Sequence, residues 1–314
     1  VSIGASVLCE VSLGLVLKRN TIADGSAVLT GLLIGFNLPP DIPLYIPIAA
    51  SVFAIGVVKW TFGGLGSNWM NPALAGRVFV FFSWTGPMTT WKSPGTLVDA
   101  VTAATPLSTV KSGLFSYSGS AAGPMEYLQE TGFPGTSADT GITDFLRKIL
   151  EPLGAQIEPG YGDLLLGNIS GCIGEVSAIL LILGSVYLFI RKIITWHIPV
   201  SFLGTFGILV WIFGGGQFGS GGFSGNVVFH LLTGGLILGA FYMATDMVTS
   251  PLTAKGMIIF GCGIGFFTFL IRFFGSFPEG VSLAIILMNI FVPAIDRYTG
   301  PKRFGVNQKD NDDE

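Results

Sequence analysis

Residues 256–272 read GMIIFGCGIGFFTFLIR, a run of 17 residues in which Arg272 is the single charged side chain. A run of this kind is typical of a helix that crosses the hydrocarbon core of a bilayer, which takes about 20 residues. Eight other apolar runs predict further spans, and the shorter ones are expected to be tilted, broken or surrounded by other helices. The nine predicted spans are residues 1–17, 25–38, 43–61, 71–85, 164–190, 197–213, 225–245, 256–272 and 280–295.

The composition of the whole chain agrees with an integral membrane protein. Of 314 residues, 50% are hydrophobic and 11% are charged, and the mean hydropathy is +0.68. A soluble domain carries about 25% charged residues, so free solubility is excluded. The net charge of -3, with no basic stripe to neutralise phosphates, argues against a nucleic-acid partner. Cys9, Cys172 and Cys262 lack CxxC spacing and therefore predict no disulfide scaffold, zinc site or iron–sulfur cluster.

The distribution of lysine and arginine predicts the orientation, because cytoplasmic ends of spans collect positive charge. With Lys18 and Arg19 inside, most basic residues at later span ends fall on the same side, and Arg272 falls on the opposite side. Residues 86–163 then form a long extracytoplasmic loop, and residues 298–314 form a polar cytoplasmic tail. We therefore predict a multi-pass protein of the cell inner membrane. The odd number of spans favours one more upstream, which gives about nine or ten helices in an all-α fold.

Short matches within the chain predict two repeats, although chance matches in a glycine-rich chain are the alternative. The halves, residues 1–85 and 164–297, are separated by the outside loop and an odd number of spans, so they are expected to be inverted copies. Inverted-repeat bundles bind ligands between the repeats, near short or interrupted helices. The matches place Gly66-Ser67 on Gly275-Ser276, Leu74-Ala75 on Leu283-Ala284, and Thr30-Gly31 on Thr233-Gly234.

A stretch of small residues in the loop, DAVTAATPL at residues 99–107, carries one carboxylate and two hydroxyls. The residues alone are typical of a flexible exposed segment. In that interpretation Asp99 caps a short helix, and Thr102 and Thr105 form local hydroxyl-to-backbone hydrogen bonds.

The same stretch resembles the flavinylation motif Dxx[ST]xAT of the RnfD/NqrB family of membrane flavoprotein subunits. The resemblance continues through NTIADGSAVLTGLLIGFNLPP, GSNWMNPALAGR, FYMATDMVTSP and MNIFVPAIDRYTGPKRFG, so it covers most of the chain, and the loop length favours the RnfD branch. It implies that a separate flavin transferase attaches FMN to Thr105 through a phosphoester, with Asp99, Thr102 and Ala104 as motif residues. Ala103 stands where the motif more often has glycine, which weakens recognition by the transferase but leaves the acceptor in place.

The resemblance also implies a function in electron transfer. It points to a membrane subunit of an Rnf-type complex that couples ferredoxin:NAD+ electron transfer to Na+ or H+ translocation, with membrane, flavin and iron–sulfur subunits as partners. The chain is not expected to be catalytically complete alone. One alternative is a channel or transporter for a small solute, which inverted-repeat bundles often are, and another is a scaffold whose polar membrane residues satisfy one another. A flavin linked to threonine would favour the electron-transfer subunit over the channel or transporter, because a channel does not require a redox cofactor.

Two amides lie at the start of the predicted span at residues 71–85. Asn68 and Asn71 are three positions apart, which places them on one helical face if a helix has already begun there. Asn71 before Pro72 is also typical of a helix N-cap with proline in the first turn. The family resemblance implies a non-covalent riboflavin near Asn68 and Asn71.

Several ionisable residues lie within or beside predicted spans, where an unpaired charge is costly. We expect Lys59, Arg77 and Arg272 to lie near enough to span ends for their side chains to reach the membrane surface. The carboxylate of Glu10 lies deeper in its span.

Two further carboxylates are predicted to lie on an ion path. Glu175 belongs to the interior of a predicted span, and Asp246 ends one near the inner face. A carboxylate beside helix-terminal carbonyl groups is suited to bind a cation, and pairing of Asp246 with Lys255 is the alternative.

Overall fold

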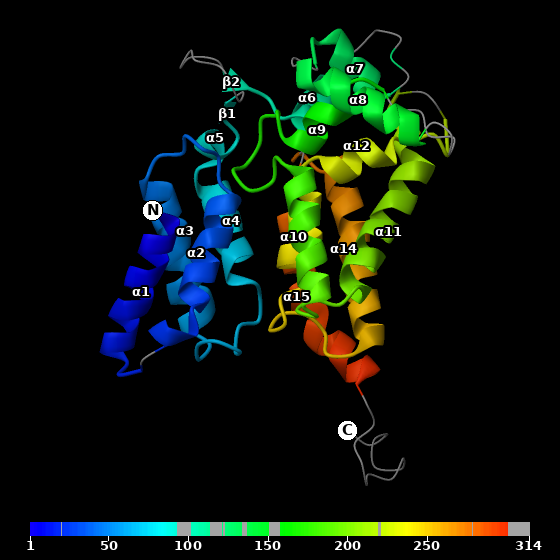
Figure 1. Cartoon of the computed structure of the whole chain (residues 1–314). Helices are drawn as coiled ribbons and strands as arrows, with labels where there is room; N and C mark the ends of the chain where they lie inside the picture. Colours follow the sequence, from blue (N-terminus) through cyan, green and yellow to red (C-terminus); the bar gives the residue numbers. More distant parts are fainter. Residues whose placement is uncertain are drawn as a thin grey trace, which may run out of the picture.

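The computed structural model of the chain is mostly helical (Figure 1). Of its helices, three are long and apolar enough to cross a membrane, and five shorter apolar helices accompany them in the part of the chain that is described. The predominantly helical character predicted from the sequence is thereby confirmed, and the long apolar helices are consistent with a membrane protein. The structure describes residues 1–19, 21–92, 102–113, 121, 123–133, 137–150, 158–218, 221–277 and 279–300.

The amino-terminal helices form one set, drawn in blue and cyan in Figure 1. Small residues allow close approach of their backbones, as is common between membrane helices. A Cβ at Gly31 would lie 2.6 Å from the Cα of Ile3, and one at Gly76 would lie 2.7 Å from the carbonyl oxygen of Ala50. The set comprises α1 (Ser2–Val16), η1 (Ile22–Asp24), α2 (Ser26–Phe36), α3 (Tyr45–Val52), its continuation as the π-helix η2 (Phe53–Trp60), and α4 (Pro72–Ser83).

The carboxyl-terminal helices form a second set. Its longest helices, α11 and α14, pack through Gly261 and Gly265, where a Cβ would lie 2.7 Å from the carbonyl oxygens of Ile198 and Phe202, respectively. This spacing of small residues brings two helix backbones into contact. The set comprises α10 (Ala178–Ile190), α11 (His197–Phe213), η4 (Gly214–Phe218), α12 (Val227–Leu232), α13 (Leu236–Leu238), η5 (Gly239–Met243), α14 (Ala254–Phe274) and α15 (Val281–Thr299).

Two predicted spans are interrupted in the structure. In residues 164–190 the helix α10 begins only at Ala178, and the preceding segment donates backbone hydrogen bonds from Ile173 and Gly174 to carbonyl groups at the end of α2. Residues 225–245 break between α12 and α13, where Gly234 and Gly235 have φ of 67° and 65°. Side chains larger than glycine are excluded there, because a Cβ would meet the buried side chains of Arg272 and Glu175.

The segment between the two sets forms a cap on one end of the bundle, opposite the carboxyl terminus (Figure 1). Its apolar core includes Met125, Leu128 and Leu164 and continues into Phe229 of α12. The buried carboxylate of Asp139 accepts backbone hydrogen bonds from Gly160 and Asp163 and so joins α8 to α9. The cap comprises α5 (Thr85–Met88), the antiparallel pair β1 (Trp91–Lys92) and β2 (Thr102–Ala103), α6 (Pro106–Gly113), α7 (Pro124–Glu130), α8 (Ser137–Leu150) and α9 (Tyr161–Leu166).

One of the internal sequence matches coincides with equivalent helix starts. The helices α4 and α15 begin at Pro72 and Val281, which are 209 positions apart. The matches of Gly66-Ser67 to Gly275-Ser276 and of Leu74-Ala75 to Leu283-Ala284 have the same offset. In Figure 1, α4 leads toward the capped end of the bundle, whereas α15 leads toward the carboxyl terminus at the other end. The match of Thr30-Gly31 to Thr233-Gly234 joins unlike structures, because the first lies inside α2 and the second lies at the helix break.

Candidate functional site

A cavity of about 330 Å³ lies between the two helix sets. Its walls come from α2, η2, the segment that leads into α4, the end of α10 and the region of η5. Small-molecule sites usually have volumes of roughly 300–1,000 Å³ and combine apolar walls with a few polar groups. This cavity fits that description. Its polar lining residues are Ser26, Thr30, Lys59, Asn68, Asn71, Tyr242, Thr245 and Asp246.

Asn68 contributes an unpartnered acceptor to the cavity. The residue is 8% exposed, and its Oδ1 atom has no hydrogen-bond partner among the residues that the structure describes. A buried acceptor left without a donor costs about 1–3 kcal/mol. The position therefore suits a ligand that presents an N–H or O–H group.

Asn71 has a different role, as the N-cap of α4. Its Oδ1 accepts from the backbone N–H groups of Ala73 (3.0 Å) and Leu74 (3.2 Å), and its Nδ2 donates to the carbonyl oxygen of Met243 (3.3 Å). The predicted N-cap is confirmed. The condition for Asn68 and Asn71 to share a helical face is not met, because α4 begins after both.

The three basic residues expected to reach the membrane surface are buried instead. Lys59, Arg77 and Arg272 are only 1%, 8% and 3% exposed, so that expectation is wrong. Each finds acceptors within the protein, which lowers the cost of burying its charge. The ammonium of Lys59 donates to Oε1 of Glu10 (2.8 Å), itself 1% exposed, and to the hydroxyl of Ser26 (2.6 Å).

Arg272 donates hydrogen bonds to the backbone at the break between α12 and α13. Its guanidinium donates to the carbonyl oxygens of His230 (2.7 Å), Thr233 (2.9 Å) and Gly234 (3.0 Å), and it lies 5.1 Å from the ring centroid of Phe206. Carbonyl groups freed where a helix stops require donors when water is absent. Arg272 therefore satisfies the backbone that the break exposes.

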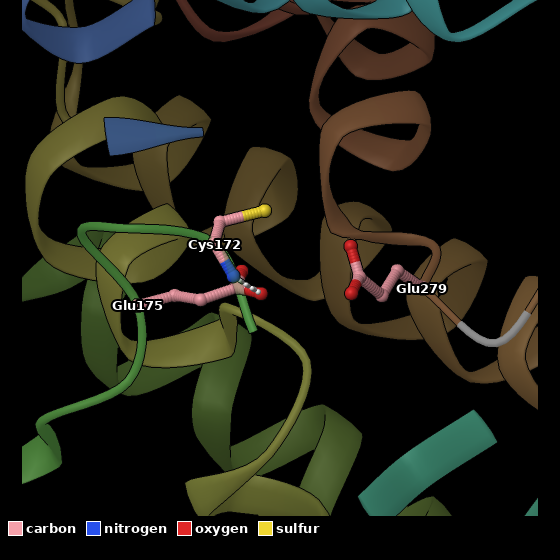
Figure 2. A group of neighbouring side chains, drawn as sticks. All are labelled: Cys172, Glu175 and Glu279. Carbon is pink, nitrogen blue, oxygen red and sulfur yellow. Dashed lines mark hydrogen bonds between the residues drawn. The ribbon is translucent and has the colours of Figure 1, made fainter. Parts of the chain in front are cut away.

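A second polar centre joins the two helix sets (Figure 2). Figure 2 shows Cys172 and Glu175, from the loop before α10, facing Glu279 from the loop before α15. One ligand atom of each lies within 4.8 Å of the others. Glu279 accepts from Nη2 of Arg77 (2.5 Å), and Glu175 accepts from the backbone N–H of Cys172 (3.0 Å).

The charge of this centre indicates what it can bind. Two carboxylates, Glu175 and Glu279, lie near two guanidinium groups, those of Arg77 and Arg272, and Arg77 also donates to the sulfur of Cys172 (3.8 Å). A cation already placed among the candidate ligands disfavours a divalent metal ion through repulsion. A proton or a monovalent cation beside Glu175 is repelled less, because it carries only one positive charge.

Asn37 connects this centre to the cavity. Its carbonyl oxygen accepts from Arg77 Nε (3.2 Å) and Cys172 Sγ (3.4 Å), and its Nδ2 atom contacts the sulfur of Met243 (3.6 Å). The backbone carbonyl oxygen of Met243 in turn accepts a hydrogen bond from Nδ2 of Asn71 at the cavity wall. Along α4, the six residues from Asn71 to Arg77 span about 9 Å at a rise of about 1.5 Å per residue.

The two predicted ion-path residues lie in different centres. Glu175 is buried beside Glu279, whereas Asp246 lines the cavity. The carboxylate of Asp246 accepts from the backbone N–H of Val248 (3.3 Å) and the hydroxyl of Thr249 (3.1 Å). Between the described residues Asp246 and Lys255 the structure contains no ion pair, so that predicted alternative is wrong.

The threonine of the DAVTAATPL stretch lies at the amino terminus of α6. Thr105 is 5% exposed, and its Oγ1 accepts from the backbone N–H of Ser108 (3.1 Å) and donates to the hydroxyl of Ser108 (3.0 Å). The expected hydroxyl-to-backbone bond is confirmed. Thr102 belongs to β2 and Ala104 is exposed, while Asp99 lies outside the described residues. Helix N-termini favour anionic groups such as phosphates, which suits a phosphoester at this position.

Lys111 fixes the other end of α6 to the membrane helices. Its ammonium donates to the carbonyl oxygens of Arg272 (2.7 Å), Gly275 (2.6 Å) and Phe277 (2.8 Å) at the end of α14. Burial, and then the charge of Arg272, lowers the pKa of Lys111 to about 8, so the amine keeps its proton at neutral pH. The helix that follows Thr105 is therefore held against the bundle.

Substitution of Lys111 by methionine is expected to loosen the cap. Hydrogen bonds to charged groups contribute about 1.5–3 kcal/mol each, so loss of all three is expected to lower the stability of the cap by about 4 kcal/mol or more. Chymotrypsin should then cleave the cap faster in the purified protein. The exposed Lys148 provides the control, since Lys148→Met should leave the cleavage rate unchanged. Equal rates for both variants would show that the three hydrogen bonds do not hold α6.

Sequence reasoning missed Glu279 and Asn37. Glu279 lies between the matched pairs Gly275-Ser276 and Leu283-Ala284, in the stretch FFGSFPEGVSLAI, which glycine and proline interrupt. A carboxylate in such a stretch could have pointed to a site. Asn37 in GFNLPP had no comparable signal, because its contacts come from Arg77 and Cys172, far away in the sequence.

Comparison with known proteins identifies related chains. Residues 1–305 match the NQR2, RnfD, RnfE family. The chain is 47% identical to a subunit of the proton-translocating ferredoxin:NAD(+) oxidoreductase complex of Clostridium ljungdahlii, over 93% of this chain and 78% of that protein. It is 40% identical to a subunit of the Na(+)-translocating ferredoxin:NAD(+) oxidoreductase complex of Acetobacterium woodii, over 97% and 80%. It is 38% identical to a subunit of the ion-translocating oxidoreductase complex of Stutzerimonas stutzeri, over 97% and 83%.

Proposed function

Because the chain belongs to the NQR2, RnfD, RnfE family, we propose that it is the membrane-embedded electron-transfer subunit of an Rnf-type complex. In this role it works with flavin and iron–sulfur subunits to couple ferredoxin:NAD+ electron transfer to Na+ or H+ translocation. Family membership over 305 residues carries this conclusion and favours it over a channel or transporter for a small solute. Three membrane-capable helices support the placement of the subunit in the membrane.

FMN on Thr105 is the first cofactor of the proposal. The motif residues and the position of the hydroxyl at the amino terminus of α6 both support it. When bound, the flavin supplies the one-electron chemistry, and the protein supplies the tether and its surroundings. Because Thr105 is 5% exposed, its side chain must turn outward before a transferase reaches the hydroxyl.

Riboflavin in the cavity is the second cofactor. The volume of about 330 Å³, the apolar walls and the unpartnered Oδ1 of Asn68 support a planar ligand with N–H groups. Asn68 would accept from such a group. Asn71 would shape the cavity by fixing the start of α4 rather than by donating to the ligand, because its side chain already makes three hydrogen bonds.

An ion path between the two helix sets is the third part of the proposal. Asp246 at the cavity and Glu175 at the second polar centre would be its carboxylates, connected through Met243 and Asn37. Carboxylates within membrane proteins commonly mark ion pathways and proton relays. Two of the relatives carry names with different ions, one with a proton and the other with Na(+).

The two asparagines provide an experiment on the riboflavin site. In the purified complex, Asn68→Ala should weaken riboflavin retention about tenfold, which corresponds to ~1.4 kcal/mol. Asn71→Ala should instead lower the free energy of unfolding by about 1 kcal/mol through loss of the N-cap. Acid extraction followed by chromatography measures riboflavin, and thermal unfolding measures stability. A wild-type complex that releases no riboflavin would remove the cofactor from the proposal.

A further inference from the structure

The buried pair of Lys59 and Glu10 lies at the wall of the cavity and has no role in the function described so far. Lys59 is in the last turn of η2 and Glu10 is in α1, and both are 1% exposed. Lys59 lines the cavity together with Ser26 and Asn68. A buried lysine is costly unless its charge is paired, so its presence at a ligand-sized cavity requires an explanation.

The hydrogen bonds around this pair hold the carboxylate in place. Oε1 of Glu10 accepts from the ammonium of Lys59 and from the hydroxyl of Thr21, and Oε2 accepts from Nε1 of Trp60 (3.0 Å). The ammonium has three N–H groups, of which two are used, toward Glu10 and Ser26. Within the described part of the chain the third has no protein acceptor, which leaves one donor for a molecule in the cavity.

We propose that Lys59 is a positioning residue for a redox ligand in this cavity and holds a positive charge against its ring. The proposal rests on the proposed function, in which the ligand is riboflavin. The pyrimidine edge of a flavin ring carries two carbonyl acceptors on either side of one N–H donor. Lys59 supplies the donor that a carbonyl requires, and the Oδ1 of Asn68 supplies the acceptor that the N–H requires.

The charge of Lys59 then favours reduction of the ring. One electron from a one-electron carrier of the complex adds one negative charge to the ring, and Lys59 keeps its proton, so no covalent bond forms or breaks. Attraction between opposite charges is much stronger in a cavity of low dielectric constant than in water. Glu10 makes the pair neutral before the electron arrives, which keeps the cationic side chain buried at a tolerable cost.

The test uses a neutral replacement of the whole pair. Lys59→Met alone would leave Glu10 as an unpaired buried charge, so the variant is the double substitution Glu10→Gln with Lys59→Met. Lys59→Arg is the conservative variant, and Lys255→Met is a control at an exposed lysine. Each variant is made in the complete complex, where riboflavin content is measured by extraction and the midpoint potential by redox titration.

We expect the double variant to retain riboflavin and to show a reduction equilibrium at least tenfold less favourable, which is 59 mV for a one-electron step. Lys59→Arg should keep the equilibrium constant for reduction within a few-fold of the wild-type value. Lys255→Met should leave it unchanged. Bound riboflavin with an unchanged potential in the double variant would overturn this inference and leave the riboflavin site intact. A wild-type complex without riboflavin would overturn both.

Discussion

Replacement of Thr105 by alanine is expected to remove all covalently bound flavin from the denatured chain. The physical reason is that the phosphoester requires a hydroxyl at this position, and alanine offers none. The chain is produced together with its flavin transferase, and intact mass and in-gel flavin fluorescence are measured for wild type and Thr105→Ala. Wild type should carry one FMN that survives denaturation.

The neighbouring hydroxyl of Thr109 provides the matched control. Thr109 follows Thr105 by one turn of α6, and its hydroxyl donates to the carbonyl oxygen of Thr105. Thr109→Ala should keep the flavin, because the acceptor hydroxyl is untouched. Absence of flavin from fully matured wild type would refute the assignment of Thr105 and would make a small-solute transporter the leading hypothesis.

Replacement of Arg77 by methionine lowers the free energy of unfolding by about 3–5 kcal/mol, the usual result of removing one partner from a buried ion pair. The guanidinium pairs with Glu279 (2.5 Å) and also donates to the hydroxyl of Ser282 and to the carbonyl oxygen of Asn37. Its loss leaves Glu279 without its ion-pair partner and beside a second carboxylate, Glu175, at the junction of the two helix sets.

A double-mutant cycle identifies the cause of that loss. Arg77→Met with Glu279→Gln removes both charges and should recover most of the lost stability, since the penalty comes from the unpaired carboxylate. Unfolding in detergent is measured for the wild type, the single variants and the double variant. Arg191→Met, at an exposed arginine, serves as the control. A cost for Arg77→Met below about 1 kcal/mol would place this pair among weak surface interactions.

The sequence by itself determined the features that depend on neighbouring residues. Apolar runs such as residues 256–272 required a membrane protein, because their length matches the hydrocarbon core and few charges interrupt them. Asn71 before Pro72 predicted where α4 begins, since an amide oxygen caps free N–H groups and proline fixes φ. The hydroxyl of Thr105 before Pro106 likewise caps α6.

The tertiary structure decided which polar residues meet. Lys59, Arg77 and Arg272 were expected at the membrane surface, because a long basic side chain near a span end can usually reach water. Their partners instead come from distant segments, as with Lys59 and Glu10, 49 positions apart, and Arg77 and Glu279, 202 positions apart. Such pairings leave no periodic signal in the sequence.

The same limit applies to the broken helices and to the cavity. Residues 225–245 are mostly apolar and predict one span, yet the chain breaks at Gly234 and Gly235, where the side chains of Arg272 and Glu175 occupy the adjacent space. The sequence identifies Asn71 as a helix cap, whereas only the tertiary structure shows that Oδ1 of Asn68 is buried at the cavity without a partner among the described residues. Local chemistry sets where helices form and begin, whereas burial and pairing depend on which helix surfaces pack together.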